Sequence, residues 1–215
     1  MNLNTYEVNI MYILLEGMPA TGKTTIAKEL QRKLKAKYIK SVLSDTLFGN
    51  SLKNIRDLGE KDKLELLILS DLALDELRVR KALDIGNVVR DKAIAATLGH
   101  LKVHNYENKN KKVIESLLIG YHQLKELIVQ PNISVYLKPN KKKIFEHLIN
   151  KKDISNTDKY LLDNFELYER QSAAIEQYMY EIYKENVLSL ECFSGTIEEM
   201  ADQILKKVNE YEKNK

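Results

Sequence analysis

Residues 17–24 read Gly-Met-Pro-Ala-Thr-Gly-Lys-Thr, which is the complete G-x-x-x-x-G-K-[ST] pattern of a phosphate-binding loop (P-loop). An apolar run at residues 10–15 precedes the loop, and a helix-forming run begins at Thr24. The two glycines allow the backbone to curl so that successive N–H groups point at one centre, which the N-terminus of the following helix also faces. This context predicts a site for the phosphates of a nucleotide rather than an ordinary turn before a helix.

The side chains of the loop predict its ligands. We expect Lys23 to reach the β- and γ-phosphates and to act in catalysis, and the Thr24 hydroxyl to bind Mg²⁺. The other loop positions are expected to surround the phosphates: Gly17, Met18, Pro19, Ala20, Thr21, Gly22 and Thr25. ATP and Mg²⁺ are therefore the expected cofactors.

Length and composition favour a single domain over residues 1–215. Hydrophobic residues make up 44% of the 215, enough to bury a sheet between helices, and 30% are charged. The net charge of +3 gives no reason to expect a polymeric nucleic acid as partner. The only cysteine, Cys192, excludes an internal disulfide, and no apolar stretch approaches the ~20 residues of a membrane span. We expect a cytoplasmic protein that does not engage a membrane.

Strand-like and helix-like apolar periods alternate along the chain. Strands are predicted near residues 9–16, 37–43, 87–91, 133–137 and 187–191. Helices are predicted near residues 24–36, 52–84, 111–130, 139–150, 159–183 and from a Thr196–Glu199 capping box onward, with a looser segment at 92–110. This alternation predicts a three-layer α/β fold, a parallel sheet covered on both faces, with its ligand at the carboxyl ends of the strands.

Three further segments resemble thymidylate kinases. Residues 65–71, Glu-Leu-Leu-Ile-Leu-Ser-Asp, followed by 81–92, are similar to that family's E-L-L…D-R helix and the strand that ends in Asp-Arg-Tyr. Residues 131–137, Pro-Asn-Ile-Ser-Val-Tyr-Leu, are similar to its P-D-l-t-i-y-L strand, and 158–170 to its lid and the helix that follows. The resemblance implies the P-loop NTPase fold with sheet order 2-3-1-4-5, a lid near residues 150–158, a relationship to deoxynucleoside kinases, and a homodimer.

The half of the pattern that would bind the phosphate acceptor departs from that family. Thymidylate kinases carry Arg-Glu-Pro after the second strand, where residues 41–46 here read Ser-Val-Leu-Ser-Asp-Thr. The arginine after Asp71 is replaced by Leu72, and Asp-Arg-Tyr becomes Asp91-Lys92-Ala93. Leucine cannot act as a bidentate donor, and lysine replaces arginine only as a point charge. The identity of the acceptor therefore stays open.

Four residues are candidates for the chemistry and the acceptor. Asp91, at a strand end, is a candidate Mg²⁺ carboxylate or acceptor-orienting group, with a turn aspartate as the alternative. Asp45 is a candidate acceptor-activating carboxylate or a loop cap. Arg56 is a candidate ligand of an acceptor phosphate. Lys92 either balances charge on the transferred phosphate or is a solvated surface lysine.

Four other residues belong to the lid and the far end of ATP. Lys151 and Lys152 fall in the lid, where cations would meet the phosphates and exclude water, or they are simply part of a polar loop. Arg170 is a candidate for the same purpose on the next helix. Phe193 follows the last strand, where the resemblance places adenine, and it either stacks on the base or belongs to the core.

These features favour an ATP-dependent kinase that transfers the γ-phosphoryl group to a nucleoside monophosphate. Two alternatives remain. One is a kinase for a nucleoside or another small hydroxyl compound, since the missing guanidiniums argue against a phosphorylated acceptor. The other is a nucleotide-binding regulatory protein or NTPase on the same fold.

Overall fold

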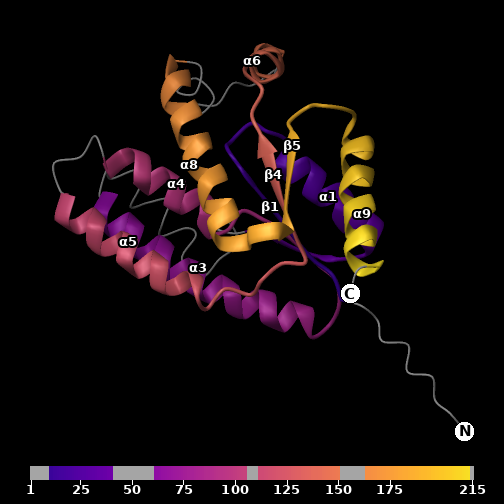
Figure 1. Ribbon diagram of the computed structural model, residues 1–215, viewed down its shortest axis with the longest axis horizontal. Coiled ribbons are helices and arrows are strands. Elements are labelled where there is room, and N and C mark those ends of the chain that lie inside the picture. The colour runs from indigo at the N-terminus through magenta and orange to yellow at the C-terminus, as the bar shows by residue number, and fades with distance from the viewer. Residues whose placement is uncertain (1–9, 41–60, 106–110, 151–162, 214–215) are drawn as a thin grey trace, which may run out of the picture.

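The structure is a computed structural model that describes residues 10–40, 61–105, 111–150 and 163–213 (Figure 1). Within these ranges helices alternate with strands along the chain. In chain order the elements are β1 (Tyr12–Gly17), α1 (Lys23–Leu34), β2 (Lys37–Lys40), α3 (Lys61–Leu83), β3 (Val88–Asp91), α4 (Ile94–Asn105), α5 (Lys111–Lys125), β4 (Ile133–Lys138), α6 (Lys141–Ile149), α8 (Phe165–Tyr183), the short 3-10 helix η1 (Lys184–Asn186), β5 (Val187–Glu191) and α9 (Ile197–Lys213).

The five strands form one parallel sheet in the order β2-β3-β1-β4-β5, which confirms the predicted fold class and strand order. β1 is the central strand, and every residue in it is buried. Its register pairs Leu15 with both Asp91 of β3 and Val135 of β4. A strand covered on both faces reads as a continuous apolar run, which is why residues 10–15 lack alternation.

Helices cover both faces of the sheet (Figure 1). On one face Ile13 and Leu15 pack with α1 and α9 in a single hydrophobic cluster. On the other face Tyr12 and Leu14 pack with α3, α4, α5 and α8. Side chains of a strand alternate between faces, so neighbouring residues of β1 serve the two different clusters.

The prediction of a looser segment at residues 92–110 is wrong for residues 94–105, which form α4. This helix lacks a polar face because the residues of its first two turns are buried almost all round, so no amphipathic period marks it in the sequence. A Cβ at Gly99 would lie 2.8 Å from the backbone nitrogen of Ile175, so glycine permits the close contact of α4 with α8.

Other helix boundaries differ from the predictions by less. Of the helix predicted over residues 52–84, residues 61–83 form α3, and 52–60 lie outside the described residues. α5 ends at Lys125 instead of residue 130. The capping box is confirmed: the Thr196 amide donates to Glu199 Oε2 at 2.8 Å, and the Glu199 amide donates to Thr196 Oγ1 at 3.2 Å. In the described part of the chain, no helix is both long and apolar enough to cross a bilayer.

A buried ionic cluster ties α3 to the sheet. Arg90 of β3 is 0% exposed and donates to Glu76 of α3. Its guanidinium also lies 3.8 Å from the buried carboxylate of Asp75. Glu76 in turn accepts a hydrogen bond at 2.9 Å from the amide of Val129, just before β4. Burial is tolerated because each charge meets an opposite charge or a backbone donor.

Replacing Arg90 with methionine should destabilise the protein by about 3–5 kcal/mol, because the carboxylate of Glu76 would stay buried without its cation, whereas Asp75 keeps its pair with Arg78. Denaturant unfolding of the purified variant measures this change. The matched control is Arg32→Met, which removes an exposed pair with Glu29 and should leave the unfolding midpoint unchanged. A similar small effect of both substitutions would show that the buried pair contributes no more than the exposed one.

Candidate nucleotide-binding site

The loop between β1 and α1 turns through backbone conformations that favour glycine. Gly17 has φ 137°, and a Cβ there would lie 2.8 Å from the carbonyl oxygen of Leu137 on β4. Gly22 has φ 85°, and its carbonyl accepts the first amide hydrogen bonds of α1. Ala20 also has a positive φ, 62°, which is strained for a residue with a Cβ. Both glycines of the motif are therefore required by the path of the chain.

Two hydrogen bonds hold the loop from inside. The Thr21 hydroxyl donates to the Met18 carbonyl at 2.9 Å, and Met18 itself is buried. The Tyr168 hydroxyl, from α8, donates to the Pro19 carbonyl at 2.9 Å. Both bonds engage carbonyl oxygens that would otherwise repel an anion. They also hold the loop in a shape in which its amides can bind phosphate.

Lys23 folds back onto the loop. Its Nζ donates to the Met18 carbonyl at 2.5 Å and lies 3.4 Å from Thr21 Oγ1. Burial lowers the pKa of Lys23 to about 8, although the nearby Asp91 carboxylate raises it in part. A phosphate group would add negative charge beside this partly buried amine.

Thr24 and Asp91 meet at the start of α1. The Thr24 hydroxyl donates to Asp91 Oδ2 at 2.5 Å, and the Tyr38 hydroxyl of β2 donates to the same oxygen at 3.2 Å. Burial and the neighbouring Asp91 raise the pKa of Tyr38, so its phenol remains a donor.

The hydroxyl of Thr24 and the carboxylate of Asp91 are the hard oxygen donors that Mg²⁺ prefers. Among the described residues no group of three or more histidines, cysteines or carboxylates could hold a metal ion by itself. The pair therefore fits an ion that takes its other ligands from phosphate and water, as Mg²⁺ commonly does.

Lys92 follows Asp91 at the same edge of the sheet. Its backbone has φ 74°, and its amide donates to the Leu15 carbonyl at 2.9 Å. The buried carboxylate of Glu16 lies beneath, where it accepts from the amides of Ala93 at 2.9 Å and Ala96 at 3.4 Å. Burial raises the pKa of Glu16, which Lys92 lowers in part. Glu16 thus caps α4 with a buried carboxyl group close to Lys92.

Phe193 lies against the P-loop from the turn after β5. Its backbone has φ 55°, and its ring approaches within 3.7 Å of the position that a Cβ of Gly22 would take. The ring of His147, on α6, stacks on Phe193 with centroids 4.9 Å apart. Phe193 is partly buried, so both of its predicted alternatives, a stacking surface and a core residue, are compatible with this position.

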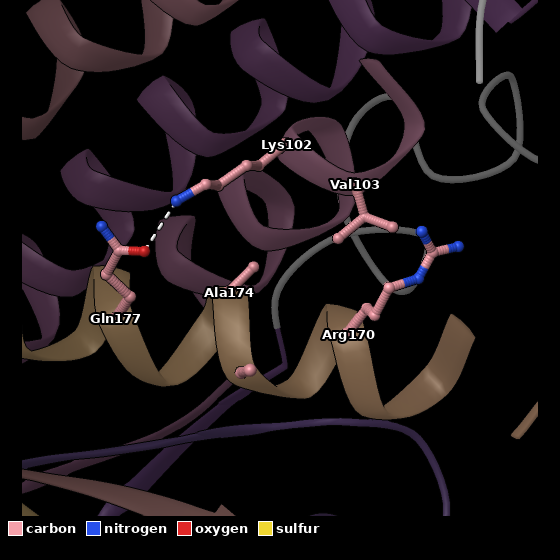
Figure 2. Close-up of a pocket in the computed structure, with 6 residues that line it drawn as sticks. Lys102, Val103, Arg170, Ala174 and Gln177 are labelled. Carbon is pink, nitrogen blue, oxygen red and sulfur yellow. Dashed lines mark hydrogen bonds between the residues drawn. The ribbon is translucent and has the colours of Figure 1, made fainter. Parts of the chain in front are cut away.

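Arg170 lies on α8, on the side of that helix that faces α4. It lines a pocket of about 430 Å³ between α4 and α8, together with Lys102, Val103, Ala173, Ala174 and Gln177 (Figure 2). Two residues along a helix are roughly 200° apart, so Tyr168 and Arg170 point to different sides of α8. Within the pocket Lys102 Nζ donates to Gln177 Oε1 at 2.6 Å. The predicted role of Arg170 at the phosphates stays a prediction.

Four predicted site residues lie outside the described residues: Asp45, Arg56, Lys151 and Lys152. Their roles stay predictions. Leu72, at the position of the family arginine, is buried in the core beneath the sheet's α3 face.

Sequence reasoning missed Glu16, Tyr38, His147 and Tyr168. Glu16 directly precedes the loop and is a charged residue in an apolar strand, which is a signal that it is paired or capping. Tyr38, His147 and Tyr168 carry no comparable signal, because tyrosine and histidine are ordinary in amphipathic segments.

The parallel sheet, the P-loop and the Thr24–Asp91 pair together define a nucleoside-triphosphate-binding protein with the P-loop kinase fold. The chain matches the AAA domain family over residues 13–174 and belongs to that family.

A cytidylate kinase from Sulfolobus acidocaldarius is 31% identical over 75 residues, which is 35% of this chain and 36% of that kinase. The match thus spans little more than a third of the curated relative. Among solved structures, deoxyadenosine kinase from M. mycoides superposes with a TM-score of 0.71 at 17% identity, covering 93% of this chain and 100% of that one. Thymidylate kinase from Candida albicans has a TM-score of 0.67 at 19% identity, covering 95% and 93%. These likenesses establish the fold.

In the absence of metal, nucleotide affinity should fall about tenfold per pH unit above pH 8. In that range binding should be accompanied by uptake of one proton by the protein. The reason is that Lys23, with its pKa near 8, is neutral there in the free protein, and bound phosphate favours its charged form. Titration calorimetry in EDTA, in buffers of different ionisation enthalpy, measures the uptake. Lys23→Ala should abolish it.

The same lowered pKa of Lys23 makes folding stability change with pH in the opposite direction to nucleotide affinity. Between pH 8 and 10.5 the unfolded chain holds the Lys23 proton that the folded, nucleotide-free chain has lost, so stability from this group rises with pH in that window. Nucleotide affinity that stays constant from pH 7 to 9.5 would contradict the burial of the amine.

Proposed function

We propose that this protein is an ATP-dependent kinase that transfers the γ-phosphoryl group of Mg-ATP to a nucleoside monophosphate. The observation that carries the proposal is the hydrogen bond between Thr24 and Asp91, adjacent to Lys23. It joins the P-loop helix to the end of β3 and gathers a cation, a hydroxyl and a carboxylate around the position for the terminal phosphates.

ATP would bind with its phosphates in the loop of residues 17–25. The loop amides, the N-terminus of α1 and Lys23 would hold the negative charge that spreads over the phosphoryl oxygens during transfer. Thr24 and Asp91 would hold Mg²⁺, which would supply positive charge to the phosphate oxygens. Phe193 and His147 offer aromatic surface beside Gly22 for the adenine.

Phosphoryl transfer depends mainly on positioning and charge, so the chain needs little covalent machinery. Lys92 would stabilise the transferred group or the acceptor phosphate from the end of β3. Asp45, Arg56, Lys151 and Lys152 remain proposed contributors from the acceptor loop and the lid. Exclusion of water by the lid would prevent hydrolysis of ATP in place of transfer.

The choice of a monophosphate acceptor is supported by the local identity with a protein named cytidylate kinase. A nucleoside acceptor is the second candidate, and a specific observation favours it. Leu72 is 1% exposed in the core, so nothing at that position can bind an acceptor phosphate. The fold neighbour from M. mycoides is named a deoxyadenosine kinase and was solved with dCMP as a product.

The partner in this proposal is a small molecule, and we place the protein in the cytoplasm. The homodimer also stays a proposal. Leu74 and Leu77 of α3 and Ile119 of α5 are exposed apolar side chains that a second copy would bury.

Coupled ADP release with Mg-ATP and a panel of nucleosides and nucleoside monophosphates tests the function. We expect release to rise at least about tenfold with one acceptor class and to fall by about a hundredfold or more in Lys23→Ala, because the charge on the phosphoryl oxygens loses its cation. ATP turnover that is equal with and without acceptors would instead show an NTPase. Nucleotide binding without any turnover would show a binding protein.

Lys92→Asn separates the two acceptor classes, because asparagine removes the charge yet tolerates a positive φ. For a monophosphate acceptor the KM should rise about tenfold while the KM for ATP stays constant, since an ionic contact to the acceptor is lost. An unchanged acceptor KM would argue for a nucleoside. Thermal unfolding of the variant provides the control for its fold.

A further inference from the structure

Tyr38 lies on the edge strand β2, next to β3 in the sheet. The register pairs Tyr38 with Val89 and Lys40 with Asp91. Val89 belongs to the hydrophobic cluster on the α1 and α9 face, and Tyr38 packs against the same cluster. Because alternate residues of a strand share a face, Asp91 also points to the α1 side, whereas Arg90 points to the α3 side.

The hydroxyl of Tyr38 reaches two positions along β3 to Asp91. It donates to Oδ2 at 3.2 Å, the oxygen that also accepts from Thr24 at 2.5 Å. The ring is partly buried by α1-face neighbours, which restricts where the hydroxyl can lie. One carboxylate oxygen is therefore held by donors from two different elements, β2 and α1.

We propose that Tyr38 is a positioning residue that orients the Asp91 carboxylate for the Mg²⁺ that accompanies a bound nucleoside triphosphate. The inference rests on one part of the proposed function, the binding of Mg-nucleotide. It does not depend on which acceptor receives the phosphoryl group. A carboxylate fixed at one oxygen by two hydrogen bonds has less freedom to rotate, so less entropy is lost when it engages the hydrated ion.

The contact with Thr24 alone does not fix Asp91 in the same way. The Thr24 hydroxyl is itself a predicted metal ligand. Its oxygen would therefore coordinate the ion while its proton is donated to Asp91. The Tyr38 phenol is not one of the groups assigned to the ion; it donates to Asp91 Oδ2 and also hydrogen-bonds with the Thr24 side chain. Tyr38 thus supports the carboxylate from β2, beside the P-loop helix.

The test measures how strongly Mg²⁺ and nucleotide favour each other's binding. The dissociation constant of a fluorescent, non-hydrolysable ATP analogue is measured in EDTA and in saturating Mg²⁺, and the ratio of the two constants is the coupling factor. Tyr38→Phe should reduce this factor about three- to tenfold, the effect of one lost hydrogen bond, with the constant in EDTA unchanged.

A double-mutant cycle assigns the effect to Asp91. Asp91→Asn should reduce the coupling factor by itself, and adding Tyr38→Phe should reduce it no further. Tyr136→Phe is the matched control, because it also removes a buried tyrosine hydroxyl, one bonded to Ser172 of α8 and on the opposite face of the sheet. It should leave the coupling factor unchanged.

An unchanged or increased coupling factor in Tyr38→Phe would overturn the inference, as would equal weakening of binding in EDTA and in Mg²⁺, which indicates a purely structural role. These outcomes leave the proposed function intact. Wild-type protein that binds no nucleotide under either condition would overturn the proposed function together with the inference.

Discussion

The parallel register of β1 with β3 and β4 is the constraint on which the site depends. It aligns Leu15 with Asp91 and Gly17 with Leu137, so the strand ends that carry the P-loop and the carboxylate meet at one edge. α1 begins at that same edge, and only there can Thr24 reach Asp91 at 2.5 Å. A slip of one residue in β3 would turn Asp91 to the opposite face, because side chains alternate along a strand.

The same alternation divides neighbouring charges of β3 between two tasks. Arg90 points into the α3 face, where Glu76 and Asp75 neutralise it and bind α3 to the sheet. Asp91 points to the α1 face, where Thr24 and Tyr38 hold its carboxylate. Consecutive residues thus belong to a buried ion pair and to the candidate nucleotide site, and the sheet keeps the two charges apart.

Of the five described non-glycine residues with positive φ, three lie around this edge, and Lys35 and Lys184 lie elsewhere. Ala20, Lys92 and Phe193 all have positive φ without being glycine, and they lie respectively in the P-loop, after β3 and after β5. Such conformations cost about 1–3 kcal/mol each and persist where surrounding structure holds them. Here neighbouring contacts supply that support: Tyr168 holds Pro19, Glu16 caps α4 after Lys92, and His147 stacks on Phe193.

The sequence by itself determined the P-loop, the alternating strands and helices, the Thr196–Glu199 capping box and the resemblance that implied the sheet order, since each is a local pattern of turns, periods and caps. It did not reveal α4, because a helix buried almost all round has no apolar period to detect. Nor did it reveal the contacts of Tyr38 with Asp91 or of Tyr168 with Pro19, which join residues 53 and 149 positions apart. Only the tertiary structure decided these contacts, because they follow from strand register and helix packing rather than from the residues beside them in the chain.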